Sequence, residues 1–133
     1  MDLKRTVSFK FQDRNYQIEF PTVGQYLEIE NEKILYSKGN WGGLISSIAN
    51  SSFKAVQIIE CIANLKILCP QLFEDFKIDV LNIDILDFSR LVAVYQKEIK
   101  PWYNSWFKEF NDILSEIDED EKKIDEDEKE DGV

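Results

Sequence analysis

Two short stretches near the start of the chain alternate apolar and polar side chains. Their apolar members are Val7, Phe9, Phe11, Tyr16, Ile18 and Phe20. A period of two is typical of strands with one buried face, and the polar residues 13–15 between the stretches predict a β-hairpin. Because a lone hairpin is marginally stable in water, we expect it to pack on helices or on another subunit's sheet.

A helix is predicted to follow the hairpin, with Thr22 as its N-cap. We expect this helix to end near Ser37, because Gly39 supplies a residue that adopts the left-handed conformation of a helix stop. The glycine-rich segment 39–43, which contains Trp41, is then expected to form a tight turn between helices.

The middle of the chain predicts the central helix of the core, over residues 53–68. Its polar side chains form one narrow stripe, and nearly all the other positions are apolar. The stripe consists of Lys54, Gln57, Glu60 and Asn64. A shorter helix is expected before the central helix, over 44–49. Pro70 is expected to end the central helix.

The pattern after residue 70 predicts two further helical faces. A mixed connector over 71–86 leads to an amphipathic helix over 88–99, which Asp84 or Asp87 can cap. Pro101 is expected to break this helix or to open a new one. The new face carries Trp102, Trp106, Phe110, Ile113, Leu114 and Ile117. The predicted fold class is therefore mainly α, with an N-terminal β-hairpin followed by a four- to five-helix bundle.

Charge divides the chain into two parts. Its 133 residues carry 26 acidic and 16 basic side chains, which gives a formal net charge of −10. Residues 116–133 hold 11 of the acidic and 3 of the basic side chains. This end repeats a heptad, 117–123 and 124–130, with one Ile in each copy, which is too few apolar positions for a coiled coil. We therefore expect a hairpin plus helical domain over 1–115 and a flexible, disordered acidic tail over 116–133, which like-charge repulsion keeps extended or frayed-helical.

Several kinds of chemistry are excluded by composition. The chain has no His, which rules out His-dependent triads and His-ligated metal sites. Cys61 and Cys69 are eight residues apart on a predicted helix, a rise of about 12 Å, so we expect two buried thiols rather than a disulfide. The tail places Lys122 where a calcium loop needs an oxygen ligand, and 39–43 lacks the ending of a phosphate-binding loop. We expect no catalysis, no metal and no cofactor.

The usual features of several kinds of partner are also missing. The chain is not basic, so we expect no nucleic-acid binding. No apolar run approaches the roughly 18–20 residues that span a bilayer, and we expect no membrane binding and no small-molecule substrate. Two cysteines and a start unlike a signal peptide favour a reducing cytosol.

Aromatic side chains are concentrated in the segment 102–110, five of them within nine residues and on at least two sides of one helix. A single core cannot receive every side of a terminal helix, so part of this surface is expected to face a partner, where Trp and Tyr are frequent hot spots. The alternative is a helix inserted fully into the domain. The candidate partner-binding residues are Trp41, Tyr95, Trp102, Tyr103, Trp106 and Phe107.

Four short patterns, in their order along the chain, resemble segments of bacteriophage tail assembly chaperones. They are Phe20-Pro21-Thr22, 25–30 (QYLEIE), 37–42 (SKGNWG) and 95–102 (YQKEIKPW). The resemblance covers about residues 7–115. It implies a mostly helical, non-enzymatic protein that shields apolar helices of the tape measure protein in the host cell cytoplasm. It also makes the codons of Lys122 and Lys123 the place to look for a ribosomal frameshift that appends a longer end.

Two other functions stay open. One is a structural virion subunit of the phage neck, connector or tail, in which the hairpin would augment a neighbouring sheet and the aromatic rings would be permanently buried. The other is an acidic interaction or nucleic-acid-mimic module, for which the tail offers its charge in a single run. The expected partners are a phage tail protein or the tape measure protein, with self-association as a further option.

Overall fold

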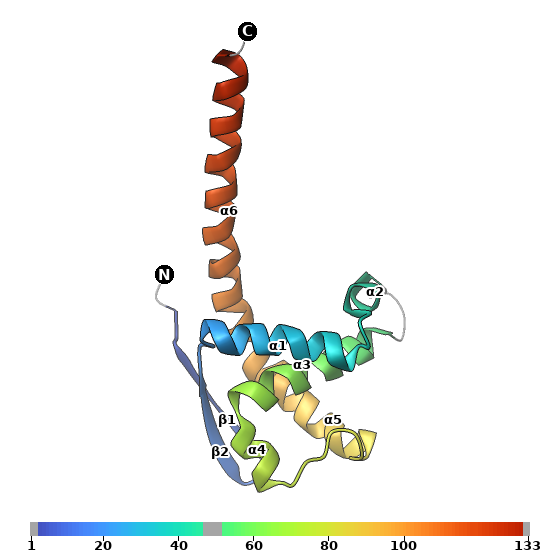
Figure 1. Ribbon diagram of the computed structural model, residues 1–133. Helices are drawn as coiled ribbons and strands as arrows, with labels where there is room; N and C mark the ends of the chain where they lie inside the picture. The colour runs from blue at the N-terminus through green and yellow to red at the C-terminus, as the bar shows by residue number, and fades with distance from the viewer. Residues whose placement is uncertain (1–2, 47–51, 132–133) are drawn as a thin grey trace.

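The chain folds into a two-stranded sheet and a set of helices, from which one long helix projects (Figure 1). The computed structural model describes residues 3–46 and 52–131, and the side chains of 3–46 and 54–116. The strands are β1 (Thr6–Phe11) and β2 (Arg14–Glu19). The helical elements are α1 (Val23–Tyr36), α2 (Trp41–Ser46), α3 (Ser52–Leu68), α4 (Pro70–Asp75), α5 (Ile85–Val94), the π-helical η1 (Tyr95–Ile99) and α6 (Lys100–Asp131). The predicted fold class, mainly α with an N-terminal hairpin followed by helices, is confirmed.

The hairpin packs one face on the helices, as predicted. Its buried side chains are Phe9, Phe11 and Ile18. The turn consists of Gln12 and Asp13, earlier than expected, because the register pairs Phe11 with Arg14 in the antiparallel ladder. Gln12 adopts a left-handed φ of 53°. The Arg14 guanidinium reaches the carboxylate of Asp75 in α4 at 3.1 Å, which joins the turn end of the hairpin to the helices.

The helix α1 begins and ends with the predicted signals. The Thr22 hydroxyl accepts a hydrogen bond from the Gln25 backbone N–H at 3.1 Å, and the Gln25 side chain accepts one from the Thr22 N–H at 2.9 Å. This reciprocal capping box satisfies two N–H groups that the first turn leaves free. Gly39 follows the helix at a φ of 80°, where the absence of a Cβ removes the steric cost.

The helix α2 begins at Trp41, so it takes up part of the segment 39–43 that was expected to be a turn. The short helix predicted over 44–49 therefore starts three residues earlier. Residues 47–49 lie outside the described residues.

The helix α3 packs against α1, α2, α4 and α5, as expected of the central element of the core. Its buried side chains are Val56, Ile59, Cys61, Ile62, Ala63, Asn64 and Leu65. Two members of the predicted polar stripe face other helices rather than solvent alone. Asn64 is only 1% exposed, and Glu60 forms an ion pair with Lys100 of α6.

The elements α5, η1 and α6 follow one another without a break. The first predicted outcome at Pro101, a break in the helix, is therefore wrong, whereas Pro101 lies at the second residue of α6, one position from the helix start that the other outcome predicted. In a regular α-helix a proline lacks the N–H donor, and its ring clashes with the carbonyl four residues earlier. Here the Lys100 N–H donates to the carbonyl of Tyr95, five residues back. This wider π turn directly precedes Pro101 and lets the helix continue through it.

The helix α6 continues into the acidic end of the chain. Its backbone is helical to Asp131, and it projects away from the other elements (Figure 1). Side chains after Glu116 lie outside the described residues. The flexibility of residues 116–133 and the boundary at 115 therefore stay predictions.

Candidate functional site: an exposed apolar surface on α1 and α6

Three of the six predicted partner-binding residues lie in the core. Tyr95 is 1% exposed, and Trp102 and Tyr103 are each 8% exposed, which corrects the expectation that they form a partner-binding surface. The continuous helix through η1 brings all three rings into the same buried cluster as the hairpin and α3. Sequence periodicity places these rings on a helix but does not reveal that the helix crosses the core.

The other three predicted residues are half-buried and do not all come together. Trp106 and Phe107 touch each other on α6, with ring centroids 5.8 Å apart. Trp41 lies on α2 and has the Lys33 ammonium 5.6 Å from its ring centroid. Among the described residues no ring contact joins Trp41 to the aromatic residues of α6. Trp106 and Phe107 therefore border the exposed part of α6, and Trp41 is separate.

A group of exposed apolar side chains on α1 and α6 lies outside the six predicted partner-binding residues. Its members, here called the α1–α6 surface, are Val23 (79% exposed), Leu27 (61%), Phe110 (38%), Ile113 (50%) and Leu114 (45%). Residues three and four apart share one side of a helix, so each helix contributes one row. The Tyr26 ring contacts the Phe110 ring at 5.7 Å, which joins the two rows where α1 meets α6.

One sequence signal could have identified this surface. The apolar spacing of 110, 113 and 114 runs directly into a long stretch of like charge. A helix that continues into a highly charged segment leaves the domain, so the apolar turns just before that segment stay in water. On α1, by contrast, nothing in the spacing distinguishes exposed Leu27 from buried Ile29.

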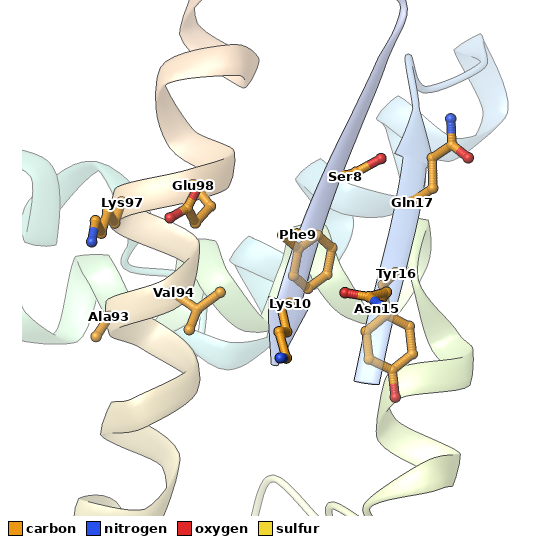
Figure 2. Close-up of a pocket in the computed structure, with 10 residues that line it drawn as sticks. All are labelled: Ser8, Phe9, Lys10, Asn15, Tyr16, Gln17, Ala93, Val94, Lys97 and Glu98. Atoms are coloured by element: carbon orange, nitrogen blue, oxygen red, sulfur yellow. The ribbon is translucent and has the colours of Figure 1, made fainter. Parts of the chain in front are cut away.

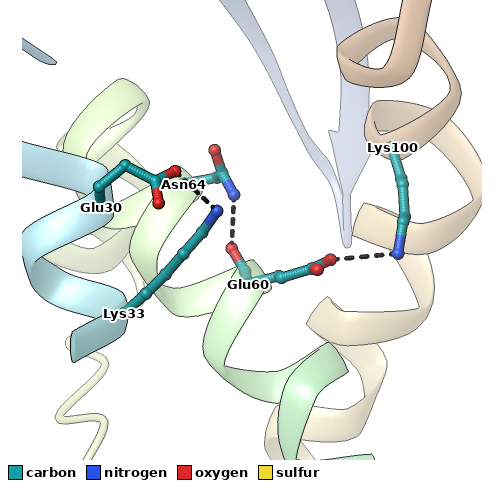
Figure 3. Close-up of polar contacts among 5 residues, drawn as sticks. All are labelled: Glu30, Lys33, Glu60, Asn64 and Lys100. Carbon is teal, nitrogen blue, oxygen red and sulfur yellow. Dashed lines mark hydrogen bonds and ion pairs between the residues drawn. The ribbon is translucent and has the colours of Figure 1, made fainter. Parts of the chain in front are cut away.

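A polar cluster lies between α1, α3 and α6 (Figure 3). Lys33 pairs with Glu30 at 3.0 Å, and Lys100 pairs with Glu60 at 3.1 Å. The Asn64 side chain donates to the Glu60 carbonyl at 2.8 Å. These bonds satisfy groups that would otherwise be costly to bury, and they link α3 to α6.

A cavity of about 120 Å³ adjoins this cluster and is also lined by Tyr103 and Asn104. The Tyr103 hydroxyl and the Asn64 Oδ1 are buried without a hydrogen-bond partner among the described residues. Burial, followed by the negative charge of Glu30, raises the pKa of Tyr103, so the phenol stays neutral at ordinary pH. The ion pairs, the Asn64 hydrogen bond and these two unpaired atoms together form an internal polar network.

A second, more open groove of about 770 Å³ lies between the hairpin and the helix α5–η1 (Figure 2). Its lining includes Ser8, Lys10, Val94, Lys97 and Glu98. No hydrogen bond joins Ser8 to another described residue, and the lining has no pair of carboxylates for acid–base chemistry.

Cys61 and Cys69 are buried free thiols, as predicted, and burial raises the pKa of the Cys61 thiol. Within the described residues no group of three or more Cys, Asp or Glu side chains could hold a metal ion. In the same parts of the chain, no helix combines the length and apolar character needed to cross a bilayer.

No protein-family model, no curated protein and no solved structure matches this chain.

Proposed function

We propose that this protein is a non-enzymatic assembly protein of a bacteriophage tail, a chaperone that covers apolar helices of the tape measure protein in the host cell cytoplasm. The observation that carries the proposal is the α1–α6 surface, a joined group of large apolar side chains beside a projecting helix. The four sequence patterns that resemble tail assembly chaperones suggest the biological setting.

The physical support comes from the grouping of these side chains. Single exposed apolar residues are ordinary on monomers, whereas a contiguous group is typical of an interaction site. Fully burying a fully exposed large apolar side chain is worth about 1.5–3 kcal/mol, and side chains that are 38–79% exposed would gain the corresponding part of this free energy. Apolar burial alone can therefore drive the binding of a partner helix that covers the α1–α6 surface, and no chemical step is needed.

In this mechanism an apolar partner helix lies along α6, against Phe110, Ile113 and Leu114, and extends toward Val23 and Leu27 of α1. The partner's apolar face is then removed from water and cannot associate with other copies. The strong negative charge of the acidic end keeps the complex soluble.

A structural virion subunit is the second candidate, and the edges of the hairpin favour it. The described sheet has only the strands β1 and β2. The Phe20 N–H donates a hydrogen bond to the Arg5 carbonyl at 3.0 Å. In an antiparallel pair, hydrogen-bonded and non-hydrogen-bonded residue pairs alternate along the strands. The backbone N–H and C=O groups of Thr6, Ser8 and Lys10 therefore face away from β2. Such an unpaired edge can accept a strand from a neighbouring subunit.

Co-expression tests the chaperone function. An apolar segment of a tape measure protein should be recovered in the soluble fraction with the parent protein and much less with Ile113→Asp/Leu114→Asp. The matched control is Leu81→Asp/Leu86→Asp, because these leucines are also exposed, at 80% and 73%, but lie outside the α1–α6 surface. Equal solubility with and without the parent protein would reject the proposal.

Mass spectrometry of purified phage particles separates the two candidates. A chaperone should be missing from the particles, whereas a structural subunit of the neck, connector or tail should be present in them at a fixed ratio to the other tail proteins.

A further inference from the structure

The helix α6 carries a row of acidic side chains beside its apolar row. Glu109, Asp112 and Glu116 are exposed and spaced by three and four residues, so they share one side of the helix. None of them has an ion-pair partner among the described residues. The α6 part of the α1–α6 surface is therefore flanked on one side by acidic side chains that form no ion pair within the described residues.

The negative charge continues along the projecting helix. Residues 109–131 hold 13 acidic and 3 basic side chains, a net charge of −10, on a backbone that is helical to Asp131. Pairing α6 with α6 of a second copy would bring two such segments together at a repulsive cost. A basic segment would instead be attracted to this helix.

Building on the proposed function, we infer that the segment received by the α1–α6 surface is a basic amphipathic helix, with an apolar row flanked by Lys and Arg. The apolar row of this partner meets Phe110, Ile113 and Leu114. Its cations meet Glu109, Asp112 and Glu116. The apolar contacts supply affinity, and the charges select basic over neutral or acidic amphipathic helices.

Three labelled synthetic peptides of about 20 residues, titrated into the full chain by fluorescence anisotropy, test this inference. The first has Leu at helical spacing flanked by Lys, the second replaces each Lys with Glu, and the third keeps Lys but scrambles the Leu positions. We expect the first to bind at least about tenfold more tightly than either of the others. We also expect its binding to weaken about tenfold between about 50 mM and about 300 mM NaCl.

A matched pair of variants locates the charge effect. Glu109→Gln/Asp112→Asn/Glu116→Gln should weaken binding of the Lys-flanked peptide about tenfold. The control Asp13→Asn/Glu19→Gln/Glu98→Gln makes the same change in net charge at exposed positions of the hairpin and η1, and should change binding by less than about twofold. Equal weakening by both variants would overturn the inference, because it would reflect net charge alone.

The other outcomes separate this inference from the proposed function. Equal binding of the Lys- and Glu-flanked peptides would overturn the basic partner and leave the apolar docking function in place. If the scrambled peptide bound as tightly as the first peptide, the inference would be overturned, because binding would then reflect charge attraction without apolar contact. A dimer in sedimentation that Ile113→Asp/Leu114→Asp dissociates would assign the surface to a second copy. A monomer that binds none of the peptides would overturn both proposals.

Discussion

The indole Nε1 of Trp102 donates a hydrogen bond of 2.8 Å to the backbone carbonyl of Lys4, 98 residues earlier in the chain. This bond ties the segment before β1 to the first turn of α6, beside a ring contact of 5.6 Å between Trp102 and Phe20. It fixes the hairpin against the helix that carries most of the α1–α6 surface. Trp106, one turn later, has a buried Nε1 without a hydrogen-bond partner among the described residues.

The two tryptophans give a matched test of that bond. Trp102→Phe is expected to lower the free energy of unfolding by about 1–3 kcal/mol, because it removes a hydrogen bond and shrinks a buried ring. Trp106→Phe is expected to cost about 1 kcal/mol or less, since its N–H has no bond to lose. Urea unfolding measures both values, and equal losses would contradict the role assigned to the bond.

Asp75 gives a prediction for acid stability. Its carboxylate accepts bonds from the Gln71 side chain at 2.7 Å and the Tyr16 hydroxyl at 2.8 Å, and it pairs with Arg14. These contacts, the Gln71 bond first, hold the pKa of Asp75 below its ordinary value of 3.8. The folded state therefore favours the charged form, and this stabilisation is complete well above pH 3.8 and disappears as the pH falls through the lowered pKa.

Asp75→Asn is accordingly expected to be less stable than the parent at neutral pH and to lose less stability on acidification. Urea unfolding at a series of pH values between about 6 and about 2 measures this difference in slope. Parallel curves for parent and variant would show that the carboxylate has the same pKa in the folded and unfolded states.

Tyr16 gives the corresponding prediction in alkali. Burial, followed by the hydrogen bond to Asp75 and its negative charge, raises the pKa of Tyr16 to about 12. The folded state favours the neutral phenol, so this stabilisation is present below the ordinary pKa of 10 and is lost as the pH rises through about 12. The difference between the phenolate absorbance titrations of the parent and Tyr16→Phe should have its midpoint near pH 12. A midpoint near pH 10, with circular dichroism unchanged, would refute the assigned environment.

The local parts of the fold could be predicted from the sequence because their causes are local. The alternation around Phe9 and Ile18 predicts the hairpin, and Thr22 and Gly39 set the limits of α1. The π turn before Pro101 could not be predicted in this way, because a proline signals a break unless the surrounding core holds the helix together. The burial of Asn64 likewise depends on α1 and α6 covering one side of α3.

The exposure of individual side chains on α6 could not be predicted. The aromatic segment predicts rings that face a partner, yet Tyr95, Trp102 and Tyr103 pack inside, and Ile113 and Leu114 remain in water. Periodicity shows which residues share a face. It does not show which face a neighbouring element covers, and that depends on where α6 leaves the domain.

Substitutions on the α1–α6 surface should separate binding from folding. Ile113→Ser/Leu114→Ser is expected to lower the free energy of unfolding by no more than about 1 kcal/mol, about 0.5 kcal/mol for each side chain, because both are about half exposed. Leu72→Ala, at a fully buried position, should cost about 2–5 kcal/mol. Thermal or urea unfolding of the two variants gives this comparison, and a large loss for the surface variant would mean that these side chains belong to the core.

The most direct test of the central claim is light scattering from a purified apolar tape measure segment as it aggregates with equimolar parent protein, with Ile113→Asp/Leu114→Asp or with Leu81→Asp/Leu86→Asp. We expect the parent and the Leu81/Leu86 variant to suppress scattering, and the Ile113/Leu114 variant, although folded, not to suppress it. Equal suppression by all three proteins would contradict the claim that the α1–α6 surface is where the partner binds.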